Sequence, residues 1–292
     1  MLTVLRMETI SVGVLGGSGV YSLDRLRNAQ ELDIVTPFGA PSDRLVVGEC
    51  EGVRAAFLPR HGRGHRLTPS EIPYRANVWA LRSLGVQRLL SLSAVGSLCE
   101  EYAPGDFVLA DQFVDRTFRR ETTFFGGGAV VHVPLAHPVC PEMMRVVRDA
   151  APGLPMKVHS GGSYVCIEGP QFSTLAESEI HRGWGCKLVG MTNATEARLA
   201  REAGMSYGCI AMVTDFDCWH PRHGDVDVAK ILEVAGRNAR NARDLVQRAL
   251  PPLAALGPSP WRGIARAGLL TAPEMIPPAT RARLGLLLDL ES

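Results

Sequence analysis

Cys209-Ile210-Ala211-Met212-Val213-Thr214-Asp215-Phe216-Asp217-Cys218-Trp219 places two carboxylates, one residue apart, at the end of an apolar run. The residues from 209 to 214 are mostly small or β-branched, which is typical of a buried parallel strand. In open α/β sheets, ligands bind at the carboxyl ends of the strands. The stretch therefore predicts an α/β fold in which Asp215 and Asp217 lie at the mouth of a ligand site.

Two neighbouring carboxylates repel one another unless a proton, a cation or a ligand lies between them. Because alternate side chains of a strand point to the same face, Asp215 and Asp217 are expected to meet there. Three interpretations are open at this point. The pair accepts hydrogen bonds from a ring nitrogen and the exocyclic amine of adenine, with one carboxyl protonating the departing base; it binds a metal ion; or it caps a turn or a helix.

Apolar runs and amphipathic patterns alternate along the rest of the chain. The predicted strands cover residues 11–15, 45–47, 54–58, 88–93, 107–110, 165–167 and 209–214, with 45–47 and 54–58 forming a hairpin. The predicted helices cover residues 74–84, 140–151, 175–183, 196–204 and 226–250. This alternation predicts a single α/β domain at residues 8–250, with a mixed, twisted β-sheet and flanking helices. Prolines crowd residues 251–292, an extension that we expect to dock on the domain or on a neighbouring subunit, with disorder as the alternative.

Composition narrows the class of partner. Lys and Arg total 31 against 30 for Asp and Glu, so the chain lacks the basic excess that a nucleic-acid polymer requires. The seven cysteines contain no Cys-x-x-Cys pair and predict reduced thiols in a cytoplasmic protein. No apolar stretch approaches the roughly 18 residues of a membrane span. A small molecule is the expected partner, with no nucleic acid and no membrane.

Three segments rich in small residues are candidate anion sites. Gly16-Gly17-Ser18-Gly19 suits a single phosphate, but it lacks the third glycine of a dinucleotide fingerprint, which argues against an NAD-linked oxidoreductase. Residues 58–65 set Arg60, His61, Arg63 and His65 among glycines that let backbone amides approach an anion. Ser93-Ala94-Val95-Gly96-Ser97-Leu98 closes the strand predicted at 88–93. Each also fits a plain turn or a solvated loop.

Two later segments, each of which follows an expected strand, carry apolar groups suited to a nucleoside. In Glu168-Gly169-Pro170-Gln171-Phe172 the aromatic ring can lie flat on a base, and in Gly190-Met191-Thr192-Asn193 the thioether offers apolar contact. Taken alone, either segment fits a core or turn role. The nucleoside-binding interpretation gains support when these segments are taken in order with the earlier ones.

Together, these segments resemble the trimeric purine nucleoside phosphorylase superfamily, and in particular its 5'-methylthioadenosine phosphorylase branch, over about residues 12–250. The resemblance rests on Gly16-Gly17-Ser18-Gly19, Thr36-Pro37-Phe38-Gly39-x-Pro41-Ser42-Asp43, Pro59-Arg60-His61-Gly62-Arg63-x-His65, Pro69-Ser70-x-Ile72-x-Tyr74-x-Ala76-Asn77, Glu168-Gly169-Pro170-x-Phe172 and Thr214-Asp215-Phe216-Asp217-Cys218-Trp219. It implies that inorganic phosphate, a co-substrate, attacks 5'-methylthioadenosine to give adenine and 5-methylthioribose 1-phosphate, in purine and methionine salvage. It also implies no metal, no organic cofactor and a homotrimer with active sites at subunit interfaces.

The resemblance further assigns site residues. Phosphate would be held by Ser18, Arg60, His61, Ser93, Ala94 and Thr192. The nucleoside would be bound by Phe172, Met191, Asp215, Asp217, His132, Val228, Ile231 and Leu232. Among these, Val228, Ile231 and Leu232 would form an apolar pocket for the methylthio group, and His132 with a leucine near Leu269 would reach into a neighbouring subunit. Asp215 and Asp217 would be catalytic, with Asp215 protonating the base or, alternatively, orienting it while water donates the proton.

Residue 215 bears on which base is accepted, and residues 193–195 depart from the family pattern. A carboxylate at residue 215 faces acceptor to acceptor with a 6-oxopurine, at a cost of about 1–3 kcal/mol, and so favours a 6-amino base. The alternatives are a phosphorylase of adenosine, methylthioinosine or other 6-oxopurine nucleosides, and a non-catalytic nucleoside-binding protein. Thr195 stands where relatives usually have proline, which leaves this helix start less rigid, and Asn193 offers an additional sugar or phosphate contact.

Overall fold

Strand β5 (Arg88–Ser97) is the centre of the fold, because three other strands, β1 (Val12–Gly16), β10 (Leu188–Gly190) and β11 (Ser206–Asp215), pair with it. Its residues 88–92 pair in parallel with β1. Further along the same strand, residues 96–97 pair antiparallel with β10. Strand β11 runs parallel to β5 and is buried up to its last residue. The buried strand predicted at 209–214 is confirmed.

A computed structural model describes residues 10–17, 26–222 and 227–289, and within them the strands form one mixed sheet. The remaining strands are β2 (Arg27–Leu32), β3 (Leu45–Cys50), β4 (Val53–Pro59), β6 (Phe107–Leu109), β7 (Gln112–Asp115), β8 (Val158–Ser160) and β9 (Ser163–Cys166). The order is β2-β3-β4-β1-β5-β10-β9-β7, and β11, β6 and β8 branch from β5. Strands β3 and β4 form the predicted hairpin. The sequence pattern did not indicate β2, β7 or β8, because β2 is largely exposed and the other two are very short.

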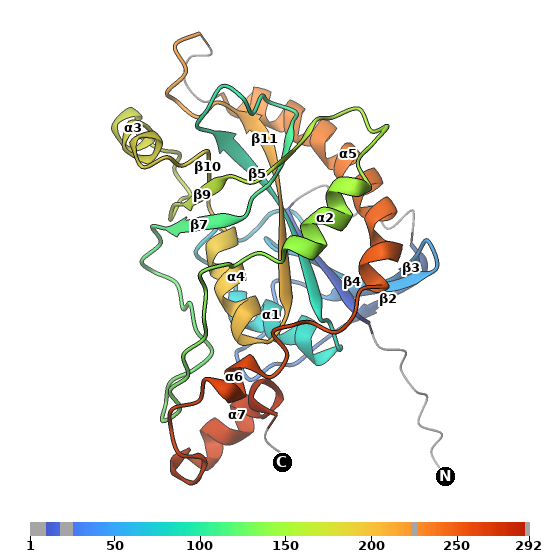
Figure 1. Cartoon of the computed structure of the whole chain (residues 1–292), viewed down its shortest axis with the longest axis vertical. Helices are drawn as coiled ribbons and strands as arrows, with labels where there is room; N and C mark the ends of the chain where they lie inside the picture. Colours follow the sequence, from blue (N-terminus) through green and yellow to red (C-terminus); the bar gives the residue numbers. More distant parts are fainter. Residues whose placement is uncertain (1–9, 18–25, 223–226, 290–292) are drawn as a thin grey trace.

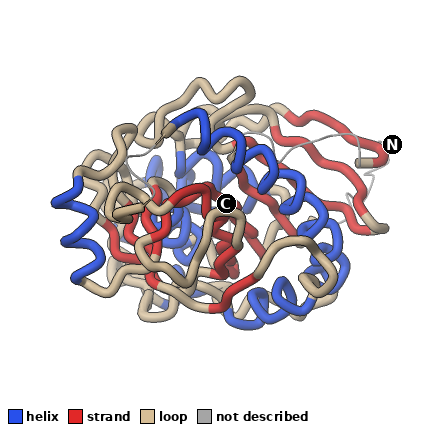
Figure 2. Tube along the Cα trace, turned by 90° about the horizontal axis from the view of Figure 1, so that it is seen from above, coloured by secondary structure: helices blue, strands red, loops and turns tan. Residues whose placement is uncertain are grey.

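Helices lie on both sides of the sheet (Figures 1 and 2). On one side α1 (Tyr74–Ser83) packs on α4 (Asn193–Glu202), and on the other α2 (Pro141–Asp149) packs on α5 (Val228–Ala254). Helix α3 (Leu175–Gly183) stands apart from these layers beside β9 and β10 (Figure 1). These contacts confirm the predicted α/β fold with flanking helices. None of the described helices is both long and apolar enough to cross a membrane.

The segment after residue 250 packs on the same hydrophobic core. Helix α5 continues through Pro251 and Pro252 to Ala254, past the expected domain boundary. The chain then forms α6 (Ile264–Ala267), a 3-10 turn (Pro273–Met275) and α7 (Pro278–Leu288). Leu284 and Leu288 are fully buried and belong to the core that also contains the central strands. In Figure 1 this segment lies at the bottom of the molecule, below α4 and α1.

Candidate active site

A cavity of about 550 Å³ opens where the ends of several strands meet. Strand β1 pairs with one edge of β5, and β4 pairs with β1 and ends in register with it. Strand β10 approaches the same edge of β5 from the opposite direction, so its carboxyl end points back toward theirs. Between the two ladders, residues 93–95 of β5 have no strand partner on this edge within the described chain. Ser93 and Ala94 line the cavity at this gap. The topology therefore brings together loops that are far apart in sequence.

Most of the predicted site residues line this cavity: Arg60, His61, Ser93, Ala94, Phe172, Met191, Thr192, Asp215, Asp217, Ile231 and Leu232. Ser18 lies outside the described residues, although the preceding Gly17 lines the cavity. Val228 begins α5 on an exposed surface and is not among the lining residues. His132 is also absent from the lining, and its backbone N–H donates to the Gly268 carbonyl at 3.0 Å.

The Asp215 and Asp217 carboxylates meet through a turn, not through strand alternation. Strand β11 ends at Asp215, and Asp217 has a φ of 51° in the left-handed region. The Asp217 N–H donates to Oδ1 of Asp215 at 2.7 Å, and the Thr214 hydroxyl donates to Oδ2 at 2.7 Å. The expectation that the pair shares one face of a strand is wrong, because an aspartate that accepts from the N–H two residues later forms its own turn.

Both carboxyl groups hold a proton more readily than usual. Burial raises the pKa of Asp215, and the charge of Asp217 adds to this, against hydrogen bonds from the Thr214 hydroxyl and the Asp217 N–H. Burial also raises the pKa of Asp217, against the hydroxyls of Ser178 and Ser173. Gly96 leaves room for the pair, because a Cβ atom there would lie 3.1 Å from Asp215 Oδ1 and 3.4 Å from Asp217 Cβ. This end of the cavity can accept hydrogen bonds from a base and supply a proton to it.

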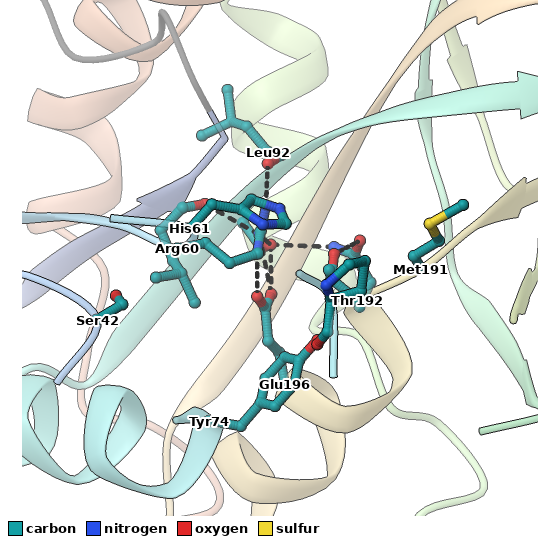
Figure 3. A network of polar contacts seen from close by, with 12 residues as sticks. Ser42, Arg60, His61, Tyr74, Leu92, Met191, Thr192 and Glu196 are labelled. Atoms are coloured by element: carbon teal, nitrogen blue, oxygen red, sulfur yellow. Dashed lines mark hydrogen bonds and ion pairs between the residues drawn. The ribbon is translucent and has the colours of Figure 1, made fainter. Parts of the chain in front are cut away.

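Arg60 is held in a buried polar network with Glu196 and Leu92 (Figure 3). Its Nε and Nη2 donate to the Glu196 carboxylate, the latter at 3.1 Å, and its Nη1 donates to the Leu92 carbonyl at 2.9 Å. Glu196 also accepts from the hydroxyls of Ser91 at 2.6 Å and Tyr207 at 3.0 Å. The sequence pattern did not reveal Glu196 as the partner of Arg60. The only indication of such a partner was general: a buried arginine is destabilising unless a carboxylate pairs with it.

Hydroxyl groups complete this end of the cavity. The Ser93 hydroxyl is buried and has no hydrogen-bond partner within the described residues, so it is available to a ligand. The Thr192 hydroxyl donates to Oδ1 of Asn193 at 3.2 Å. Asn193 itself is fully buried, and its Nδ2 donates to Ser91 Oγ at 3.0 Å and Tyr207 Oη at 2.9 Å. The expected ligand contact of Asn193 is wrong, because its amide supports the site from behind.

His61 presents a neutral ring to the cavity. Its Nδ1 lies 2.8 Å from the Leu67 carbonyl oxygen, and its ring stacks on His65 with centroids 4.2 Å apart. Burial and the adjacent Arg60 guanidinium lower the pKa of His61 to about 4. The ring is therefore uncharged at neutral pH.

The chain is similar to known proteins over most of its length. A family model described as the phosphorylase superfamily matches residues 11–251. The chain belongs to the phosphorylase superfamily. It is 50% identical over 282 residues to an S-methyl-5'-thioadenosine phosphorylase of Gloeobacter violaceus, covering 95% of this chain and 94% of that protein. A second relative of the same name, from Cereibacter sphaeroides, is 55% identical over 240 residues and covers 82% of each chain.

Solved structures resemble this phosphorylase superfamily member along nearly its whole length. A methylthioadenosine phosphorylase from an antarctic soil metagenomic library has a TM-score of 0.91 and 45% identity, and covers 96% of this chain and all of that one. The methylthioadenosine phosphorylase of Schistosoma mansoni in complex with adenine has a TM-score of 0.84 and 38% identity, and covers 89% of this chain and 99% of that one. These solved structures therefore share the fold of this chain, and they carry the same enzyme name as its relatives in sequence.

The walls of the cavity in this phosphorylase superfamily member are mainly apolar. Ile231, Leu232 and Ala235 of α5 form one wall. Met191 and the half-exposed Phe172 form another, and the loop before Phe172 is packed so closely on Met191 that a Cβ atom at Gly169 would lie 2.5 Å from the Met191 sulfur. Among the described residues no cluster of three or more His, Cys, Asp or Glu side chains is arranged to hold a metal ion.

Proposed function

We propose that this chain catalyses the phosphorolysis of S-methyl-5'-thioadenosine, giving adenine and 5-methylthioribose 1-phosphate. One observation carries the proposal: a single cavity joins a proton-holding carboxylate pair beside Gly96 to a polar site beside Ser93. Three residues of strand separate these points, which is a span of about 10 Å. That span suits a purine at one end and a phosphate at the other, with the sugar between them.

The chemistry follows from these two ends. Phosphate held by Ser93, Thr192 and the loop of Arg60 and His61 attacks the anomeric carbon, and its negative charge stabilises the positive charge that develops on the sugar. Asp215 donates a proton to the departing adenine, for which a raised pKa is required at neutral pH. Met191 packs against the sugar and Phe172 against the base. No metal and no organic cofactor takes part.

Substrate choice is set at both ends of the nucleoside. Asp215 and Asp217 offer acceptors to the ring nitrogen and the amine of adenine, whereas a 6-oxopurine presents an acceptor of its own at this position. The apolar wall of Ile231 and Leu232 favours a methylthio group over the hydroxyl of adenosine, since a hydroxyl buried there would lose its hydrogen bonds. The names of the relatives support the same substrate.

We further propose that the protein is a homotrimer in the cytoplasm, with each active site completed by a neighbouring subunit. Residues 131 and 269 form an antiparallel bridge, which sets His132 beside Leu269, and neither His132 nor Leu269 lines the cavity of the same chain. The resemblance to the family implies that this pair reaches into the active site of a neighbouring subunit, which supports the proposal. Sedimentation of the purified protein tests the assembly. A trimer supports it, and a monomer with full activity contradicts it.

The experiment that tests the function measures base release from four nucleosides, with and without inorganic phosphate. We expect strictly phosphate-dependent release of adenine from S-methyl-5'-thioadenosine, slower release from adenosine, and little turnover of methylthioinosine and inosine. Preference for methylthioinosine would retain the reaction and overturn the roles of Asp215 and Asp217. Binding of the nucleosides without turnover of any of them would indicate a binding protein.

A further inference from the structure

Arg120 joins three loops that follow three neighbouring strands. Strand β9 pairs in parallel with β7 on one side and with β10 on the other, so the three strands end at the same edge of the sheet (Figure 1). Arg120 belongs to the loop after β7, Glu168 to the loop after β9 and Met191 to the loop after β10. The Arg120 side chain is 1% exposed, and Arg120 is not among the residues that line the active-site cavity. Its effect on a ligand in that cavity must therefore pass through the loops that it contacts.

The Arg120 guanidinium donates to a backbone carbonyl in each of the other two loops. Nη1 donates to the Met191 carbonyl, and Nη2 donates to the Glu168 carbonyl at 2.8 Å. Nε forms an ion pair with Oε1 of the Glu168 carboxylate at 3.5 Å. The same carboxylate accepts from the Phe118 N–H, in the Arg120 loop, at 2.7 Å. One buried guanidinium thus closes a network that runs through all three loops.

Ser70, from the segment before α1, belongs to the same network. Its hydroxyl donates to the Glu168 carboxylate and lies 3.5 Å from Arg120 Nη2, from which it accepts. Neither Ser70 nor Glu168 lines the cavity, although both belong to segments on which the family resemblance rests. Their contacts with Arg120 show that these two side chains support the cavity wall from behind.

The chemistry of the acceptors around Arg120 requires a guanidinium. Two carbonyl oxygens and one carboxylate meet at this point, and a buried carboxylate is destabilising without a cationic partner. A guanidinium presents five N–H groups in a rigid planar fork, whereas the ammonium of lysine is a compact point charge. Arg120 therefore balances the charge of Glu168 and also sets the distance between the Glu168 and Met191 loops.

The two loops that Arg120 holds form different parts of the proposed nucleoside site. Phe172, further along the Glu168 loop, packs against the base in the proposed complex, and Met191 packs against the sugar. Both residues line the cavity. The loops are in close contact, because a Cβ atom at Gly169 would lie 2.5 Å from the Met191 sulfur. A shift of either loop would therefore change the spacing between the base-binding and sugar-binding walls.

The phosphate end of the cavity has a separate support. Thr192 is the N-cap residue of α4, and Glu196 of the same helix binds Arg60 through both carboxylate oxygens. Arg120 takes no part in these contacts between Glu196 and Arg60. Loss of the Arg120 side chain should therefore impair nucleoside binding and leave phosphate binding largely intact.

We propose that Arg120 is a positioning residue that fixes the base-binding and sugar-binding loops relative to each other, an inference that rests on the proposed function. It acts through Glu168 and Met191 and contacts no reacting atom. A ligand that spans both loops, such as S-methyl-5'-thioadenosine, needs the fixed spacing, whereas free adenine contacts only the base-binding part. Arg120 therefore governs the affinity for the whole nucleoside more than the affinity for its base.

Kinetics and ligand binding of Arg120→Ala test the proposal. We expect kcat/KM for S-methyl-5'-thioadenosine to fall about 10- to 100-fold, the size of effect that misplacement of a substrate-positioning group produces. The KM for phosphate should change little. In calorimetric titrations without phosphate, the Kd of the nucleoside should rise much more than the Kd of free adenine. Arg119→Ala removes the exposed neighbouring arginine and is the matched control, with wild-type values expected throughout.

Two outcomes of these measurements would overturn the proposal. An equal loss of affinity for adenine and for the nucleoside would show that Arg120 does not set the spacing between the loops. An equal rise in the KM values of nucleoside and phosphate would show a general distortion of the site. Thermal unfolding of Arg120→Ala shows whether the fold is kept.

Chemical rescue separates the geometry of the guanidinium from its charge. A second cavity, of about 140 Å³, is lined by Arg120, Ser70 and Tyr74, so a small cation can reach the space that truncation leaves. Guanidinium at low concentration should restore part of the nucleoside affinity of Arg120→Ala, whereas ammonium at the same ionic strength should not. Equal rescue by both cations would overturn the proposal.

Arg120→Lys decides the question if Arg120→Ala does not fold. Lysine keeps the charge and loses the planar fork, so nucleoside affinity should again fall more than adenine affinity. Wild-type nucleoside affinity in Arg120→Lys would overturn the proposal. The titrations require no turnover, so failure of the proposed function is a separate result, seen as wild-type enzyme that releases no adenine with phosphate.

Discussion

The carboxylate of Glu196 is the counter-charge of Arg60: both side chains are buried, with 0% and 1% of their surface exposed, and two guanidinium nitrogens donate to the two carboxylate oxygens. The pair joins the end of β4 to α4 beneath the phosphate end of the cavity. The charge of Arg60 is therefore already compensated before an anion binds. For the proposed reaction, we expect hydroxyl groups such as that of Ser93 to carry a larger share of phosphate recognition.

Glu196→Ala should destabilise the fold by about 3–5 kcal/mol, because it leaves the Arg60 charge buried without a partner. Denaturant-induced unfolding measures the loss. Glu179→Ala is the matched control, since it removes an exposed ion pair with Arg182 that contributes at most about 1 kcal/mol. Equal losses in the two variants would show that the buried pair is not specially stabilising.

Asp215→Asn should change the preference for the base. An amide at residue 215 can donate to the oxygen of a 6-oxopurine, so the ratio of kcat/KM for S-methyl-5'-thioadenosine to that for methylthioinosine should fall at least tenfold, the equivalent of about 1.4 kcal/mol. Asp149→Asn, at an exposed position on α2, should leave the ratio unchanged. An unchanged ratio in Asp215→Asn would remove residue 215 from base recognition.

The raised pKa of Asp215 predicts how stability changes with pH. A carboxyl group whose pKa is higher in the folded state binds its proton more tightly there, so its contribution is complete below the unfolded value and is lost as pH rises through the folded value. The amide introduced by Asp215→Asn does not titrate. The free energy of unfolding of this variant relative to wild type should therefore rise from about pH 4 to pH 7. A difference that falls over this interval would mean that the native carboxylate is stabilised as an ion.

The apolar wall of α5 can be tested at two neighbouring positions. Ile231→Thr puts a hydroxyl in the cavity and should lower the kcat/KM ratio of S-methyl-5'-thioadenosine to adenosine about tenfold, because a buried hydroxyl changes the relative cost of the two 5' groups. Val228→Thr makes the same kind of change one turn earlier, outside the cavity lining, and should have little effect. Similar effects of both changes would place Val228 at the site as well.

Gly96→Ala should weaken nucleoside binding selectively. The new methyl group would lie 3.0 Å from Val189 Cγ1 and 3.1 Å from Oδ1 of Asp215 and would displace the carboxylate pair, so the KM for the nucleoside should rise and that for phosphate should change little. Gly183→Ala, at the end of α3 with open space around it, is the control. Steady-state kinetics with each substrate varied in turn distinguishes the two. An equal rise in both KM values would indicate a general distortion of β5.

The amino-acid sequence by itself determined the fold class and the family, and most of the site residues predicted from it line the cavity. Apolar runs such as 209–214 mark buried strands because a long strand covered on both faces has little choice of side chain. The loops of Arg60, Ser93, Met191 and Asp215 were identifiable because each follows a strand, where backbone groups turn toward a ligand. Exposed β2 and the short strands β7 and β8 carry no such pattern.

Only the tertiary structure decided how these groups are paired and protonated. It turns Asn193 away from the cavity, gives Arg60 its partner Glu196, and closes the Asp215 and Asp217 pair with a turn beyond the strand. It also orients the His61 ring through the Leu67 carbonyl. Burial, hydrogen-bond direction and the pKa of a side chain depend on neighbours that lie far away in the chain, and a one-dimensional pattern does not contain them.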